Sequence, residues 1–137
     1  MLGSRTPAAG GQTEESMARN KKKVLVVEDN PNMSGLLSDM LEVFDVESVC
    51  ASDGVEALNL VNDKDFGMVI SDLRMPKMNG TELLLAVKER YPGMPVVLIS
   101  GYAVETADDE TVTRRADGFL SKPFKMNELQ EVLSKFM

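Results

Sequence analysis

Carboxylates, hydroxyls and one ammonium group stand directly after four short apolar runs of this sequence. Three carboxylates packed together raise one another's pKa unless a cation joins them, and a small all-oxygen site suits Mg²⁺. A carboxylate beside Mg²⁺ and a lysine can attack a phosphoryl group, whose charge the metal, ammonium and hydroxyl then share. The positions are Glu28 and Asp29, then Ser71 and Asp72, then Ser100, and finally Ser121, Lys122 and Pro123.

The complete absence of histidine narrows the chemistry further. It removes the commonest general base, the serine–histidine triads and most zinc sites. Any reaction must therefore use carboxylates, hydroxyls or lysine, with or without a hard metal ion. Taken singly, each position has a plainer interpretation, since acidic residues favour helix N-termini and Asp29 or Asn30 could cap a helix that starts at Pro31. Because these residues occur together at the ends of four expected strands, a shared metal and phosphoryl site is favoured over separate helix caps and turn residues.

A fold that gathers the ends of these apolar runs is needed to make such a site. Amphipathic stretches with helical spacing separate the runs, so the chain reads as five strand–helix units in an α/β fold. This alternation predicts a parallel sheet covered on both faces, with its site at the carboxyl ends of the strands. We expect strands at 24–27, 46–51, 68–70, 96–99 and 118–120, and helices at 33–44, 55–61, 81–90, 103–115 and 129–136.

Length and composition agree with one such domain. The 137 residues suffice for one hydrophobic core, and residues 1–20 lack apolar periodicity, so we expect a disordered segment or tag there and a domain at 21–137. The net charge of −7 argues against direct nucleic-acid binding, and no apolar run is long enough for a membrane span. Cys50 is the only cysteine, so no intrachain disulfide can form, which suits the cytoplasm.

Four segments, taken in this order, resemble the receiver domains of bacterial response regulators, which act in two-component signalling. The likeness covers about residues 22–137. It implies a flavodoxin-like doubly wound (βα)5 fold with a five-stranded parallel sheet in the order 2-1-3-4-5. The segments are 24–30 (VLVVEDN), 71–80 (SDLRMPKMNG), 96–101 (VVLISG) and 118–124 (GFLSKPF).

The resemblance implies a role for each residue of the metal and phosphoryl site. Glu28 and Asp29 would be the acidic pair that binds Mg²⁺, and Asp72 would be the phosphoacceptor. The backbone carbonyl of Arg74 would complete the metal shell. Lys122 would pair with a phosphoryl oxygen, and a cis peptide bond would join it to the following proline, Pro123.

The resemblance also implies switch and modulator positions. Ser100 would be the hydroxyl that moves onto the phosphoryl group, although threonine is commoner there. Phe119 would be the switch aromatic, a position that often holds tyrosine. Arg74 and Tyr102 would stand at the mouth of the crevice, where we expect them to slow hydrolysis of the acyl phosphate.

Three rival interpretations are weighed against this one. A dehalogenase-type phosphatase needs a second aspartate two residues after the nucleophile, where this chain has Arg74. A flavodoxin-like electron carrier needs a hydroxyl- and glycine-rich phosphate loop, where this chain has acidic residues after the first strand. The third is a pseudo-receiver, with the same fold used only for protein binding; it stays open as the alternative, although the set of carboxylates, hydroxyl and lysine is intact.

The resemblance also sets expectations about partners. The phosphoryl donor would be a phosphohistidine on a histidine kinase or a phosphotransfer domain, because this chain has no histidine. We expect the signal to pass to an output domain or a second copy through the helix at 103–115, the strand at 118–120 and the last helix. The chain could be a stand-alone regulator or a piece of a hybrid kinase or multidomain regulator; the sequence leaves both open, and it names neither kinase nor output.

Overall fold

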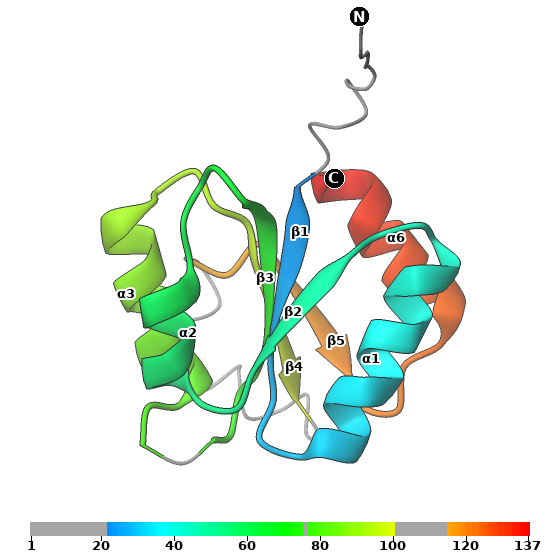
Figure 1. Ribbon diagram of the computed structural model, residues 1–137, viewed down its shortest axis with the longest axis horizontal. Helices are drawn as coiled ribbons and strands as arrows, with labels where there is room; N and C mark the ends of the chain where they lie inside the picture. The colour runs from blue at the N-terminus through cyan, green and yellow to red at the C-terminus, as the bar shows by residue number, and fades with distance from the viewer. Residues whose placement is uncertain (1–21, 76, 101–114) are drawn as a thin grey trace, which may run out of the picture.

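The computed structural model describes residues 22–75, 77–100 and 115–137 (Figure 1). Five parallel strands form one sheet in the order β2-β1-β3-β4-β5, as the resemblance implied. The strands are β1 (Lys23–Val27), β2 (Ser48–Ala51), β3 (Phe66–Asp72), β4 (Val96–Ser100) and β5 (Gly118–Ser121). The helices of the described residues are α1 (Pro31–Val43), α2 (Gly54–Leu60), α3 (Gly80–Arg90) and α6 (Met126–Phe136).

The helices cover both faces of the sheet, with α1 and α6 on one face and α2 and α3 on the other (Figure 1). Successive side chains of a strand point to opposite faces, so the strands supply two separate apolar cores. In β1, Val24 and Val26 pack toward α1 and α6, whereas Leu25 and Val27 pack toward α2 and α3. This burial on both faces explains why β1, β3 and β4 are almost continuously apolar.

Side-chain caps start the two helices that follow β1 and β3. Asn30 caps α1 by accepting from the backbone N–H of Asn32, and Pro31 occupies the first turn. Asn79 and Glu82 form a reciprocal capping box at the start of α3. Three residues connect β1 to α1 and seven connect β3 to α3, so both helices begin near the carboxyl edge of the sheet.

Several expected boundaries differ from those observed. The second strand begins at Ser48 rather than residue 46, and it lies at the sheet edge as its polarity indicated. The third runs from Phe66 to Asp72, longer than the apolar run 68–70. In α1, Leu37 and Leu41 are buried. Leu36 is 52% exposed, although it belongs to the same helical pattern of apolar residues. The expected helix at 103–115 lies outside the described residues except for Arg115.

The described helices also bear on membrane insertion. The longest of them, α1, has 13 residues. None of the helices in the described part of the chain has the length and apolar character that a membrane span needs. The first 20 residues lie outside the described part, so the expectation of a disordered segment there stays a prediction.

Candidate functional site

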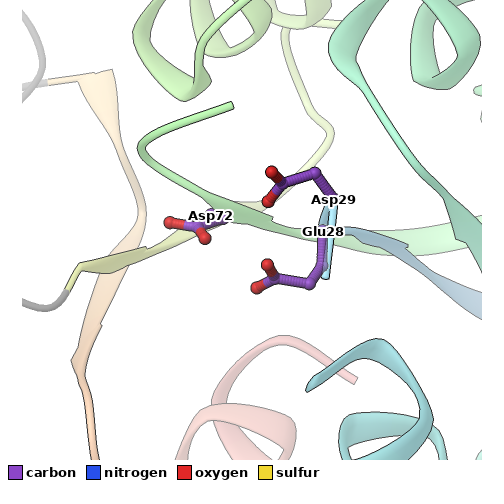
Figure 2. Close-up of side chains that lie close together, drawn as sticks. All are labelled: Glu28, Asp29 and Asp72. Atoms are coloured by element: carbon purple, nitrogen blue, oxygen red, sulfur yellow. The ribbon is translucent and has the colours of Figure 1, made fainter. Parts of the chain in front are cut away.

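Three carboxylates meet at the carboxyl ends of the two central strands. Glu28 and Asp29 directly follow β1, and Asp72 is the last residue of β3, its neighbour in the sheet. One oxygen of each lies within 4.8 Å of the others, and all three carboxylates point into the same space (Figure 2). Glu28 and Asp72 are buried, whereas Asp29 is exposed. Parallel topology thus brings together residues more than 40 positions apart, as the sequence analysis predicted.

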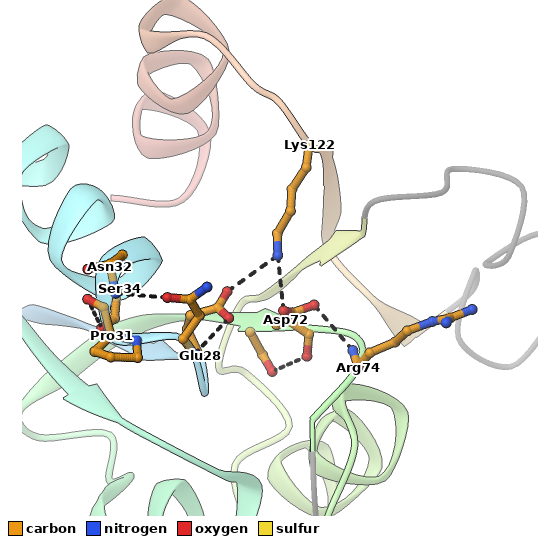
Figure 3. A network of polar contacts seen from close by, with 9 residues as sticks. Glu28, Pro31, Asn32, Ser34, Asp72, Arg74 and Lys122 are labelled. Carbon is orange, nitrogen blue, oxygen red and sulfur yellow. Dashed lines mark hydrogen bonds and ion pairs between the residues drawn. The ribbon is translucent and has the colours of Figure 1, made fainter.

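Lys122 provides the positive charge of the site. It follows β5, and its Nζ lies 3.1 Å from Oδ2 of Asp72 and 3.5 Å from Oε1 of Glu28 (Figure 3). The backbone holds it in place, since the Lys122 N–H donates to the carbonyl of Ser100 at 2.8 Å. The peptide bond to Pro123 is cis. The one ammonium group therefore bridges two of the three carboxylates.

Two backbone amides also bind carboxylates of the site, one at Asp72 and one at Glu28. The N–H of Arg74 donates to Oδ1 of Asp72 at 3.2 Å, so each oxygen of that carboxylate has a donor. The N–H of Asn30 donates to Oε2 of Glu28 at 3.2 Å. Residue types do not encode backbone donors of this kind, so neither contact could be predicted from the sequence. They fix the directions in which the two carboxylates point.

Burial controls the charge state of Glu28. It raises the pKa of that carboxyl from the usual 4.5 to about 7, and the nearby charge of Asp72 adds to the rise. The Asn30 amide and the Lys122 charge act in the opposite direction, but they do not cancel it. Oε1 of Glu28 is buried without a hydrogen-bond partner, and its ion pair with Nζ of Lys122 is long, at 3.5 Å.

The pKa of Lys122 moves the other way from what burial alone would cause. Burial lowers the pKa of its ammonium group, but the hydrogen bond and charge of Asp72, helped by Glu28, outweigh burial and raise it above the usual 10.5. Lys122 is therefore charged at neutral pH, and among the described residues its one positive charge faces three carboxylates. The site has an excess of negative charge and an orphaned buried oxygen.

That excess fits a hard divalent cation. Carboxylate oxygens are the preferred ligands of Mg²⁺, which is commonly held by one or two carboxylates with water and phosphate oxygens. Glu28, Asp29 and Asp72 form the one cluster in the described part of the chain that could hold a metal ion. The orphaned Oε1 of Glu28 is an available ligand atom. The donor set therefore fits the Mg²⁺ expected from the sequence.

The two residues expected to act as a switch, Ser100 and Phe119, lie on neighbouring strands. Ser100 ends β4 and is 6% exposed, and it pairs in register with Ser121. Phe119 lies in the edge strand β5 and is 39% exposed. The side chain of Arg74 is exposed and extends away from Asp72, so only its backbone contacts that carboxylate (Figure 3). Tyr102, the other expected modulator, lies outside the described residues.

Comparisons with known proteins agree with the observed fold. The sequence model of the response regulator receiver domain matches residues 24–134. The chain is 34% identical over 113 residues to the response regulator protein FleR of Pseudomonas aeruginosa, covering 82% of this chain and 24% of FleR. It is 31% identical over 113 residues to the sensor histidine kinase RcsC of Salmonella typhi, covering 82% of this chain and 12% of RcsC. The chain thus spans about a quarter or less of the length of these curated relatives.

Solved structures show the same fold. The response regulator TrrA of Thermotoga maritima, in complex with Mg²⁺ and BeF, aligns with a TM-score of 0.78 at 29% identity, covering 85% of this chain and 99% of TrrA. The receiver domain of NtrX from Brucella abortus aligns with a TM-score of 0.75 at 33% identity, covering 82% of this chain and 96% of that domain. The fold of this chain therefore occurs in solved response regulator and receiver-domain structures.

Proposed function

This chain belongs to the response regulator receiver domain family, and from that premise we propose that Asp72 accepts a phosphoryl group and thereby switches a partner-binding surface. The observation that carries the proposal is the placement of Asp72. Its carboxylate lies within 4.8 Å of the acidic pair and 3.1 Å from the Lys122 ammonium group. A carboxylate held between a cation and a metal site is the arrangement that attack on a phosphoryl group requires.

The reaction forms one bond and breaks one. An oxygen of Asp72 attacks the phosphorus atom in line with the leaving group, so an acyl phosphate forms as the bond from phosphorus to the donor atom breaks. The leaving group takes the bonding electrons. Lys122, now 3.1 Å from Oδ2 of Asp72, neutralises charge on the transferring oxygens. Ser100, buried at the end of β4, supplies a hydroxyl donor to the phosphoryl group after transfer.

Mg²⁺ is the cofactor proposed for this reaction. Glu28, Asp29 and Asp72 would hold it, together with the backbone carbonyl of Arg74. When bound, Mg²⁺ offsets negative charge on the phosphoryl oxygens and carboxylates. The orphaned oxygen of Glu28 supports this assignment, and so does the similarity to TrrA, whose structure holds Mg²⁺ and BeF.

The donor proposed is a phosphohistidine of a histidine kinase or a phosphotransfer domain. The chain contains no histidine, so a phosphohistidine donor must lie on another domain or protein. Similar segments occur in both response regulators and sensor histidine kinases, which fits either a separate regulator or part of a larger signalling protein. The chain would catalyse only its own phosphorylation and dephosphorylation. Residues 21–137 are proposed as the domain and the cytoplasm as its location.

The surface proposed to change on phosphorylation includes β5, α6 and the segment 103–115, of which the structure describes only Arg115. Phe119 in β5 is 39% exposed at the sheet edge, so its ring has room to change position. An output domain or a second copy would bind there. Amide hydrogen exchange with and without phosphorylation tests this surface. Changes at β5 and α6 are expected, and changes confined to α1 would contradict the proposal.

Phosphorylation with a small donor tests the function and separates it from the pseudo-receiver alternative. With Mg²⁺ and acetyl phosphate, intact-mass spectrometry is expected to show the gain of one phosphoryl group. Asp72→Asn should gain none, because the amide is a far weaker nucleophile, and Asp63→Asn, at an exposed aspartate before β3, is the matched control. Equal phosphorylation of wild type and Asp72→Asn would refute Asp72, and none in wild type would favour the pseudo-receiver.

A further inference from the structure

The first residue of α2 touches the loop that follows Asp72. A Cβ built at Gly54 would lie 2.7 Å from the carbonyl oxygen of Met78 and 2.8 Å from its Cβ and Cγ. These distances are shorter than van der Waals contact, and the carbonyl and Cβ of Met78 cannot rotate away as a side-chain tip can. The start of α2 and the loop entering α3 lie close together at the lower end of the molecule in Figure 1.

A charged contact joins the same two segments. Oδ2 of Asp53, the cap of α2, lies 3.5 Å from Nζ of Lys77. Lys77 has a φ of 68°, so the chain makes a sharp turn directly before Met78. The loop after Asp72 therefore meets α2 through an ion pair at Lys77 and through close packing at Met78.

That loop is closed onto the end of β3. The N–H of Gly80 donates to the carbonyl of Leu73 at 2.9 Å. A Cβ at Gly80 would lie 2.6 Å from the carbonyl oxygen of Asp72, so the far end of the loop rests directly on the phosphoacceptor. The capping box of Asn79 fixes the same end to α3. Met78 lies two residues before Gly80, which contacts Leu73 and Asp72, so a displacement of Met78 would act next to the end of β3.

The start of α2 is itself held firmly. Oδ1 of Asp53 accepts from the N–H of Glu56 at 2.8 Å. The Glu56 carboxylate in turn accepts from the N–H and the hydroxyl of Ser52 at 2.8 and 3.0 Å. The strand before it is tied to the acidic pair, since the N–H of Glu28 donates to the carbonyl of Ala51 at 3.0 Å. These hydrogen bonds hold the start of α2 in position, so it can restrain the loop after Asp72 where the two segments touch.

We propose that Asp53 and Gly54 are positioning residues for phosphorylation, which hold the loop after Asp72 so that the Arg74 N–H stays on the Asp72 carboxylate. This inference rests on the proposed function, because the reaction affected is phosphorylation of Asp72. Gly54 acts through the absence of a side chain, which lets Met78 approach, and Asp53 acts through Lys77. Neither residue touches the reacting atoms.

Paired glycine-to-alanine substitutions test the proposal. Gly54→Ala is expected to lower the phosphorylation rate constant at saturating acetyl phosphate and Mg²⁺ on the order of tenfold, because small displacements of reacting groups slow catalysis strongly. It should also shift the Arg74 amide signal in a ¹H–¹⁵N spectrum. Gly35→Ala in α1 is the control, since a Cβ there meets nothing within 4 Å. It should change neither, and circular dichroism checks that both variants fold.

Two milder variants keep the test decisive if Gly54→Ala does not fold. Asp53→Asn keeps a capping side chain, and Lys77→Met changes an exposed side chain, so each removes the ion pair without disturbing the core. Both are expected to slow phosphorylation and shift the Arg74 amide in the same direction, less than Gly54→Ala. If wild type is phosphorylated while every folded variant keeps its rate and Arg74 signal, the positioning role is refuted and the proposed function stands. If wild type is not phosphorylated, the proposed function itself fails.

Discussion

Glu28 is expected to make the metal-free protein less stable as the pH rises from about 4.5 to about 7. Burial and the charge of Asp72 raise the pKa of Glu28 in the folded state to about 7, whereas an unfolded chain has the usual 4.5. The folded state therefore binds this proton more tightly. The resulting stabilisation is fully present below about pH 4.5 and is lost as the pH rises through 7. Glu28→Gln removes the ionisation and with it this dependence.

The size of the effect follows from the difference between 4.5 and about 7. At about 1.36 kcal/mol per pH unit, the loss is on the order of 3 kcal/mol between pH 4.5 and pH 8. No imidazole titrates in this range, because the chain lacks histidine. The pKa of Asp53 is lowered, so its contribution to the free energy of unfolding is lost only as the pH falls below about 4. The pKa of Lys122 is raised, so its contribution is lost only as the pH rises above about 10. Glu28 should therefore cause most of the change in the free energy of unfolding between pH 5 and 8.

Urea unfolding followed by circular dichroism at pH 5, 6, 7 and 8, with a chelator present, measures this effect. Circular dichroism is the appropriate probe because the chain has no tryptophan. Glu28→Gln should gain stability relative to wild type from pH 5 to pH 8, while Glu89→Gln, at an exposed position of α3, should follow wild type. If the difference between wild type and Glu28→Gln is the same at pH 5 and pH 8, the Glu28 carboxyl has no raised pKa and the burial argument is wrong.

Three further predictions concern the metal, the ammonium group and the lifetime of the acyl phosphate. Asp29→Asn should weaken Mg²⁺ binding in calorimetry on the order of tenfold, and unchanged affinity would remove Asp29 from the metal site. Lys122→Met should destabilise the protein by about 1–3 kcal/mol in urea unfolding, because it leaves two buried carboxylates without their cation; unchanged stability would show that the ion pairs contribute nothing net. Arg74→Asn and Tyr102→Glu should each speed loss of the phosphoryl group, on the order of tenfold at most, if these side chains shield it. An unchanged or slower loss of mass would refute shielding, and the outward direction of the Arg74 side chain already favours a smaller effect there.

Much of the site could be predicted because strand ends follow from simple patterns. An apolar run buried on both faces marks a central parallel strand, and such strands end at one edge of the sheet. This pattern predicts that Glu28, Asp72 and Lys122 lie together, and the distances agree. The roles of Ser100 and Phe119 rest on resemblance, and their positions on β4 and β5 are compatible with those roles without testing them.

The rest could not be predicted, because it depends on the backbone and on distances of a few ångströms. The amide of Arg74 binds Asp72 regardless of the side chain it carries. Contact between Gly54 and Met78 depends on how closely two loops approach. Leu36 and Leu37 both fit the apolar spacing of α1, yet only Leu37 is buried, because the covered stripe of a surface helix is narrower than the run of apolar residues.

Locating the phosphoryl group is the most direct test of the central claim. After treatment with acetyl phosphate and Mg²⁺, borohydride reduction converts a phosphorylated aspartate to homoserine, and peptide mapping by mass spectrometry finds its position. Because Asp72 is the buried carboxylate held by both Lys122 and the Arg74 amide, homoserine is expected at position 72. Homoserine at another position, such as 29, or its absence from a protein that gained one phosphoryl group, would contradict the assignment of Asp72.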